Sequence, residues 1–163
     1  MARAAHISET PATALLKANK IDFTGHPYEY LEHGGANHSA EVLAQDPFIV
    51  IKTLIMQDEL AKPLVVLMHG NRKVSTKNLA RQIECKSVEP CKPEVANKHS
   101  GYLVGGTSPF ATKRDMPVFI EETILGLPRI FINGGRRGFL INIDPQVCIK
   151  LLNARLVNCA LAD

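Results

Sequence analysis

The nine residues FIVIKTLIM at positions 48–56 constrain the fold of this chain more than any other stretch. Apolar side chains occupy both alternating faces of this run, which is the pattern of a strand buried on both sides in the middle of a sheet. A second apolar run, PLVVLMH, follows at positions 63–69. We therefore expect a sheet with residues 48–56 at its centre and residues 63–69 as another of its strands.

One lysine, Lys52, interrupts the first run and shares a face of it with Val50 and Leu54. An ammonium group cannot remain desolvated without a partner, so this side chain must reach water, pair with an acid or face a cleft. A lone cation at such a position is typical of functional sites. Lys52 is therefore a candidate site residue, with snorkelling or ion pairing as the structural alternative.

Two glycine-rich stretches follow later in the chain, GYLVGGTSP at 101–109 and NGGRRG at 133–138. Because glycine has no Cβ, its backbone takes positive φ readily and lets a ligand approach the main-chain N–H groups. Such loops suit a ribose, a phosphate or a developing oxyanion. One glycine pair alone would indicate a tight turn, but two such stretches together with Lys52 favour a binding or catalytic site.

Composition excludes several classes of protein. The 163 residues are 45% hydrophobic and 21% charged, which indicates one ordered globular domain. No apolar run approaches the roughly 20 residues of a membrane span, and the first residues lack the apolar core of a signal peptide, so a cytoplasmic protein is expected. The four cysteines show no metal-ligand spacing, and neither a metal nor a cofactor is expected.

The net charge of +3 is too small to indicate nucleic-acid binding by itself. Three basic pairs, at residues 72–73, 113–114 and 136–137, can still contact a few phosphates. The first pair is more typical of a solvated loop. For the other two, which each follow a glycine-rich stretch, a solvated loop and a phosphate contact remain equally open.

Local signals predict alternating helices and strands. The expected helices cover residues 11–20, 39–44, 77–84, 93–100, 121–125 and 145–153, with Thr10, Ser39 and Ser75 among the N-caps and Gly101 as a C-terminal stop. Besides the two central runs, the expected strands cover residues 21–30, 116–120, 129–132, 138–143 and 156–161. Strands outnumber the crossovers of a doubly wound sheet, so we expect an α+β fold with a curled mixed sheet surrounded by helices.

Three motifs in this order resemble those of the YbaK/EbsC aminoacyl-tRNA deacylases: VIKTL at 50–54, SGYLVGGTSP at 100–109 and GGRRG at 134–138. Short matches at residues 10–12, 15–16 and 28–29 extend the resemblance to about residues 10–160, within one domain covering 1–163. The resemblance implies the barrel-like curled sheet of that family. It also implies an editing enzyme acting in trans, similar to the insertion editing domain of bacterial prolyl-tRNA synthetases.

Such an enzyme cleaves the ester between a wrong amino acid and the 3′-terminal ribose of tRNA, because a synthetase pocket rejects amino acids of similar size only weakly. The implied partners are the acceptor end of a mischarged tRNA and prolyl-tRNA synthetase. By resemblance, the catalytic residues are Lys52, Gly101, Gly105 and Gly106, with the main-chain N–H groups of the glycines stabilising the oxyanion. The implied substrate-binding residues are Tyr28, Thr53, Tyr102, Thr107, Ser108, Gly134, Gly135, Arg136 and Arg137.

The sequence offers no Ser-His-Asp or Cys-His arrangement, so water or the side chain of the substrate is the expected nucleophile. His99 is expected to be a surface histidine whose protonated form is favoured by the C-terminus of a helix. Leu140 stands where cysteine-editing relatives tend to carry an acid. Cys-tRNA(Pro) remains the expected substrate, with Ser- or Thr-tRNA as the close alternative and a non-catalytic tRNA- or synthetase-binding module as the alternative from another class.

Overall fold

The computed structural model describes residues 9–162. Strand β2 (Val50–Asp58) lies at the centre of a mixed sheet and is paired along both edges. One edge pairs antiparallel with β3 (Pro63–His69), and the other pairs parallel with β7 (Ile130–Asn133) and antiparallel with β5 (Val88–Pro90). The expected central strand is confirmed, although it begins at Val50 because the preceding residues form the 3-10 helix η1 (Pro47–Ile49).

The sheet continues outward from β2 on both sides, in the order β1-β8-β7-β2-β3-β6-β9. The strands not yet given are β1 (Thr24–Pro27), β8 (Phe139–Ile143), β6 (Val118–Glu121) and β9 (Arg155–Val157). Strands β4 (Arg72–Val74) and β10 (Ala160–Ala162) pair in a separate ribbon. Parallel pairs join β2 to β7, β3 to β6 and β6 to β9, and the remaining pairs are antiparallel. The α+β fold with a mixed sheet is confirmed.

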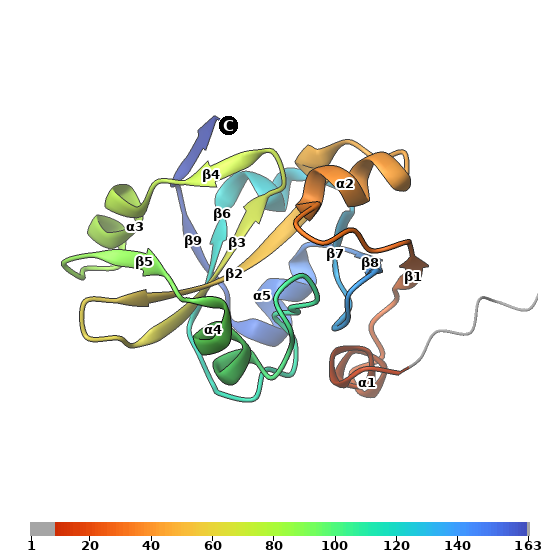
Figure 1. Cartoon of the computed structure of the whole chain (residues 1–163), viewed down its shortest axis with the longest axis horizontal. Coiled ribbons are helices and arrows are strands. Elements are labelled where there is room, and N and C mark those ends of the chain that lie inside the picture. The colour runs from red at the N-terminus through yellow and green to blue at the C-terminus, as the bar shows by residue number, and fades with distance from the viewer. Residues whose placement is uncertain (1–8, 163) are drawn as a thin grey trace, which may run out of the picture.

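Helices surround this sheet, and local signals set several of their ends. They are α1 (Pro11–Ala18), α2 (Gly35–Val42), α3 (Thr76–Gln82), α4 (Pro93–Ser100) and α5 (Gln146–Leu152), with the 3-10 helix η2 (Glu122–Gly126). Thr10 and Ser75 cap α1 and α3, and Gly101 ends α4 with a φ of +81°, as predicted. Figure 1 shows α3 and β5 at the opposite end of the molecule from α2 and β1.

Three predictions about elements are wrong. The strand expected at 21–30 is the short β1, because pairing with β8 selects Thr24–Pro27 and the following residues leave the sheet. Ser39 does not cap a helix, since α2 already begins at Gly35 and the Ser39 hydroxyl donates to the carbonyl of Ala36 within it. The strand expected at 156–161 is divided between β9 and β10.

The core lies on both faces of the sheet. One cluster packs α1, α5 and the Tyr102–Phe110 region against Ile51, Ile132 and Ile141, and a second packs α3 against Val66 and Met68. Cys148 is fully buried in the first cluster. Among residues 9–162, no helix combines the length and the apolar character needed to cross a membrane.

Thr10 joins α1 to the second glycine-rich stretch. Its buried hydroxyl accepts from the Thr13 N–H and donates to the Gly134 carbonyl at 2.5 Å. Thr10→Ala should therefore lower the free energy of unfolding by about 1–3 kcal/mol, because a cap is lost and a carbonyl loses its partner. Denaturant unfolding measures this change, with the exposed Thr24→Ala as control. Equal stabilities of the two variants would contradict the assigned contact.

Candidate functional site

A cleft of about 590 Å³ lies beside the centre of β2. Its walls come from β2 itself, the segment at residues 28–39, the α4 helix with the residues on either side of it, and the β7–β8 hairpin. Both glycine-rich stretches found in the sequence therefore contribute residues to the same cleft. The segment at residues 28–39, which includes the start of α2, supplies a wall that sequence analysis represented only by Tyr28.

The two glycine-rich stretches pack against each other backbone to backbone. Gly106 is buried, and a Cβ at this position would lie 2.6 Å from the Arg137 nitrogen and 2.7 Å from the Arg136 carbonyl carbon. Side chains add two bonds across the same contact: Asn133 Nδ2 donates to the Gly105 carbonyl at 3.1 Å, and Arg137 Nε donates to the Val104 carbonyl at 3.0 Å. The loop and the turn thus form one continuous wall.

The main-chain N–H groups of this loop differ in what they can offer a ligand. The Gly101 N–H donates to the Asn97 carbonyl at 2.9 Å, and the Gly106 N–H donates to the Leu103 carbonyl at 2.7 Å. The N–H groups of Gly105 and Thr107 have no hydrogen-bond partner within residues 9–162, and both residues line the cleft. In this conformation the donors left for an oxyanion are therefore those of Gly105 and Thr107, and not those of Gly101 and Gly106.

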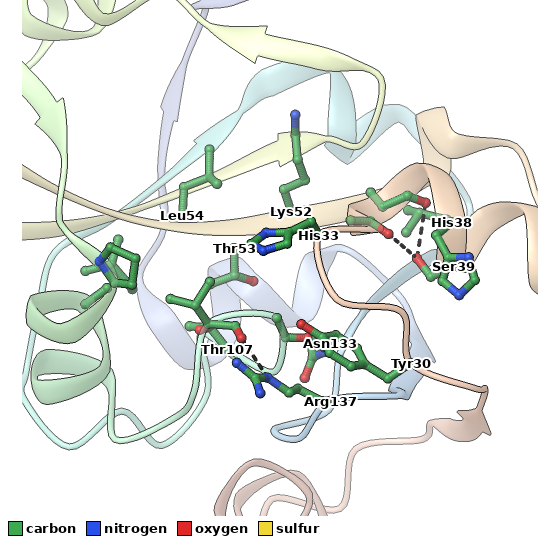
Figure 2. A pocket seen from close by; sticks show the side chains of 18 of the residues that line it. Tyr30, His33, His38, Ser39, Lys52, Thr53, Leu54, Thr107, Asn133 and Arg137 are labelled. Carbon is green, nitrogen blue, oxygen red and sulfur yellow. Dashed lines mark hydrogen bonds between the residues drawn. The ribbon is translucent and has the colours of Figure 1, made fainter.

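Lys52 and Thr53 are neighbours on β2 that point to opposite faces of the strand. Figure 2 shows Thr53 directed toward Thr107 and Arg137, and Lys52 directed away from them. The half-buried Lys52 ammonium donates to the Arg72 carbonyl at 2.6 Å, and the residue lines the cleft. The Thr53 hydroxyl oxygen is buried and has no hydrogen-bond partner in the described chain. Thr53 therefore faces the loop at residues 101–109, which is called the glycine loop below, and Lys52 does not.

Two residues of the expected binding set are buried parts of the loop that do not line the cleft. The Tyr102 hydroxyl donates to the Phe110 carbonyl at 2.6 Å, and burial raises the pKa of Tyr102 to about 12. The Ser108 hydroxyl accepts from the Phe110 N–H at 3.1 Å. Both side chains thus stabilise the fold of the segment at residues 101–110. This structural role is enough to explain why these positions carry a tyrosine and a serine, without any contact to a ligand.

Three residues of the second stretch also have structural contacts. A Cβ on Gly134 would collide with the Phe139 ring, and Gly135, at a φ of +106°, lies against Thr10 and Tyr102. The Arg136 guanidinium lies over the Phe139 ring at 4.7 Å, and its buried Nε has no partner among the described residues. Arg136 does not line the cleft. Only Arg137 of this expected basic pair does.

Tyr28 lies in the cleft wall as expected, together with several residues that sequence analysis did not select. Burial, followed by the nearby Tyr30, raises the pKa of Tyr28. The Arg137 guanidinium lies 5.2 Å over the Tyr30 ring, and a Cβ on Gly105 would touch the Tyr30 hydroxyl. The other polar lining residues missed by sequence analysis are Glu32, His33, His38, Ser39, Asn97 and Asn133. Of these residues, only Asn133 could have been selected from the sequence, because it directly precedes the Gly-Gly pair of the second glycine-rich stretch.

Leu140 lies in the wall of the cleft, whereas His99 lies outside it. Leu140 is 4% exposed, lines the cleft and packs against Val50 and Phe131, so the wall there is apolar. His99 does not line the cleft. Burial, with Arg114 and Lys98 as further causes, lowers the pKa of His99, which is opposite to the effect expected from the C-terminus of the helix. No group of three or more metal-binding side chains lies together in the described part of the chain.

These features define an α+β protein with a cleft formed by two interlocked glycine-rich segments and a central strand. Residues 35–151 match the family model of the aminoacyl-tRNA editing domain, and the chain belongs to this family. A relative from Enterococcus faecalis, EbsC, is 26% identical over 156 residues, or 95% of each chain. It is described, provisionally, as a Cys-tRNA(Pro)/Cys-tRNA(Cys) deacylase.

Two further proteins resemble this chain. A proline–tRNA ligase of Limosilactobacillus fermentum is 22% identical over 107 residues, which is 63% of this chain and 19% of the ligase. A crystal structure described, again provisionally, as a trans-editing enzyme for prolyl tRNA synthetase has a TM-score of 0.78. The match covers 96% of this chain and 100% of that one, at 17% identity. This likeness confirms the fold.

Gly106→Ala tests the contact between the two glycine-rich stretches. The new methyl group would press on main-chain atoms that have no rotamer to relax, so the free energy of unfolding should fall by about 1–3 kcal/mol. Gly126→Ala is the matched control, because a Cβ there meets nothing within 4 Å. Thermal or denaturant unfolding measures both changes. If the two variants are equally stable, the two stretches are not packed as described.

Proposed function

We propose that this chain is an aminoacyl-tRNA deacylase that acts in trans on mischarged tRNA. The observation that carries the proposal is the cleft, in which the glycine loop and the buried Thr53 hydroxyl of β2 face each other within an aminoacyl-tRNA editing domain. Ester cleavage builds negative charge on the carbonyl oxygen, and fixed N–H donors stabilise that charge. The N–H groups of Gly105 and Thr107 are the proposed donors.

Lys52 has a different proposed role from these donors. Because its side chain leaves β2 on the face opposite Thr53, its ammonium suits a terminal phosphate or ribose better than an ester carbonyl at the glycine loop. The Arg72 carbonyl already orients the ammonium by accepting one of its three protons. Arg137 and Tyr28, which both line the cleft, are the proposed contacts to the acceptor end.

The proposed preferred substrate is Cys-tRNA(Pro). A cysteine thiol can attack the carbonyl carbon of its own ester: the S–C bond forms, the bond from the carbonyl carbon to the ribose oxygen breaks, and the ribose oxygen takes up a proton. This route needs no enzymatic nucleophile. The apolar wall at Leu140 is compatible with a thiol, and the similarity to EbsC supports the same choice. Serine and threonine hydroxyls have much higher pKa values, so their esters would require an oriented water.

The second candidate is a module that binds tRNA or a synthetase without turnover. The well-packed glycine loop would serve either function, because Tyr102 and Ser108 fold it without a ligand. Release of amino acid from mischarged tRNA at catalytic protein concentration distinguishes the two. Binding without turnover across a panel of mischarged tRNAs would favour the module.

Lys52→Met should lower kcat/KM for mischarged tRNA by roughly 30- to 1000-fold, since a charge-assisted contact worth about 2–4 kcal/mol is lost while the apolar stem is kept. Lys52→Arg should recover part of the rate. The exposed Lys62→Met is the matched control and should behave as wild type. Near-normal turnover by folded Lys52→Met would exclude the role, and loss of folding would instead indicate a structural lysine.

Wild-type protein should release amino acid from Cys-tRNA faster than from Ser-, Thr- or Ala-tRNA. The expected products from Cys-tRNA include a thiolactone or the species formed by its hydrolysis, because the thiol itself attacks the ester. Initial rates on the four mischarged tRNAs, measured at equal concentration, test the order. Faster release from Ser- or Thr-tRNA would contradict the cysteine assignment and leave the deacylase assignment intact.

A further inference from the structure

We propose that Lys98, Lys113 and Arg114 form a docking site for the phosphate backbone of tRNA, outside the cleft and next to it. Below, these three residues are called the α4 cation cluster. The inference rests on the proposed function, because it takes an RNA to be the molecule whose end enters the cleft. It adds a second contact surface that none of the sequence motifs of the family contains.

Main-chain bonds hold the cluster in place. The N–H of Lys113 donates to the Ser100 carbonyl at 2.9 Å, and the N–H of Arg114 donates to the His99 carbonyl at 3.0 Å. The Thr112 hydroxyl donates to the Arg114 carbonyl at 2.8 Å. The segment at residues 112–114 is thereby fastened to the last turn of α4. The main chain of Lys113 and Arg114 is thereby held against the two residues that follow Lys98.

The cluster is exposed, and its charge is not neutralised by neighbours. All three side chains are exposed, and none has a carboxylate oxygen within 4.0 Å among residues 9–162. Glu94 and Asp115 are close in sequence but pair with none of the three. Arg114 Nη1 lies 3.4 Å from His99 Nδ1, and the positive charges of Arg114 and Lys98 add to burial in lowering the pKa of His99. Burial is the largest cause of this shift, but the two cations contribute to it, so both lie near the same imidazole.

The α4 helix places the cluster beside the cleft. Asn97 lines the cleft, and its side-chain oxygen accepts the Val104 N–H of the glycine loop at 2.8 Å. Lys98 is the next residue on the same helix, and Lys113 lies against Gly101, where the loop begins. An RNA strand whose 3′ end enters the cleft would cross this rim. Its phosphates would then meet the cluster within the nucleotides that precede the terminal adenosine.

An RNA suits this surface better than an acidic protein does. The cluster is small, polar and next to a cleft assigned to the end of an RNA. Helix C-termini favour cations, which accounts for Lys98, but the dipole does not require the separate segment that brings Lys113 and Arg114 to the same place. Phosphate contacts by such cations are electrostatic and depend strongly on salt.

The test compares two triple variants that each remove three positive charges. Lys98→Gln/Lys113→Gln/Arg114→Gln removes the cluster, and Lys20→Gln/Lys62→Gln/Lys150→Gln removes three exposed lysines elsewhere. Each is assayed on full-length Cys-tRNA and on 3′-O-cysteinyl adenosine, which has no phosphate backbone. Binding of uncharged tRNA is measured by fluorescence anisotropy over a series of salt concentrations.

We expect the cluster variant to lose about tenfold in kcat/KM on full-length tRNA, mainly through KM, and to be unchanged on cysteinyl adenosine. The plot of log affinity against log salt should become less steep, with the magnitude of its negative slope reduced by about 2, because each lost phosphate contact contributes about 0.7–0.9. The control variant should keep the wild-type slope. Equal losses on both substrates, equal effects of both variants, or unchanged tRNA affinity with lost binding to prolyl-tRNA synthetase would each overturn the proposal.

The deacylase assignment and the proposed docking site can fail independently of each other. Absence of turnover by wild-type protein on every mischarged tRNA would contradict the deacylase assignment. The binding of uncharged tRNA would still decide on the α4 cation cluster, because that measurement requires no ester cleavage.

Discussion

The main chain of Gly106 lies directly on the main chain of Arg136 and Arg137, with no side chain between them. This contact joins the loop after α4 to the turn between β7 and β8. The same turn receives the Thr10 hydroxyl from the start of α1, and β7 itself pairs in parallel with β2. The position of the glycine loop relative to the central strand therefore depends on a close approach that only glycine permits.

The cleft is a consequence of this arrangement. With the loop fixed on one side, Thr53 of β2 faces Thr107 across the cleft (Figure 2), and Asn133 and Arg137 hold the rim by donating hydrogen bonds to two loop carbonyls. Polar groups that are held before a ligand binds cost little reorganisation during reaction. The opposite face of β2 carries Lys52, so one strand presents a hydroxyl to one side and a cation to the other.

Much of the fold could be predicted from the sequence because its signals are local. Thr10 and Ser75 are N-caps, Gly101 ends a helix at positive φ, and the run at residues 48–56 is apolar on both faces, so each signal can be read without knowing its spatial neighbours. Strand β1 could not be placed in this way. Its four residues are an edge strand whose limits are set by pairing with β8, more than a hundred residues later.

The site could be predicted only in part for the same reason. The motifs identified the segments that meet, and Lys52, Thr53, Gly105, Thr107 and Arg137 do line the cleft. A motif does not tell whether a residue faces the ligand or folds the loop, so Tyr102 and Ser108, which are buried, were included with the binding residues. The wall formed by residues 28–39 depends on how the irregular residues before α2 place that helix beside β2, and no periodic pattern indicates such a path.

The central claim is that the cleft beside β2 receives the aminoacylated 3′ end of tRNA. Titration of ¹⁵N-labelled protein with a non-hydrolysable 3′-cysteinylamino analogue of adenosine, followed by amide chemical-shift mapping, tests this claim most directly. The largest shifts are predicted at Thr53, Gly105 and Thr107, with smaller ones at Asn133 and little change on α3. Shifts confined to α3 or to the ribbon of β4 and β10, or saturable binding that leaves Gly105 and Thr107 unperturbed, would contradict the account.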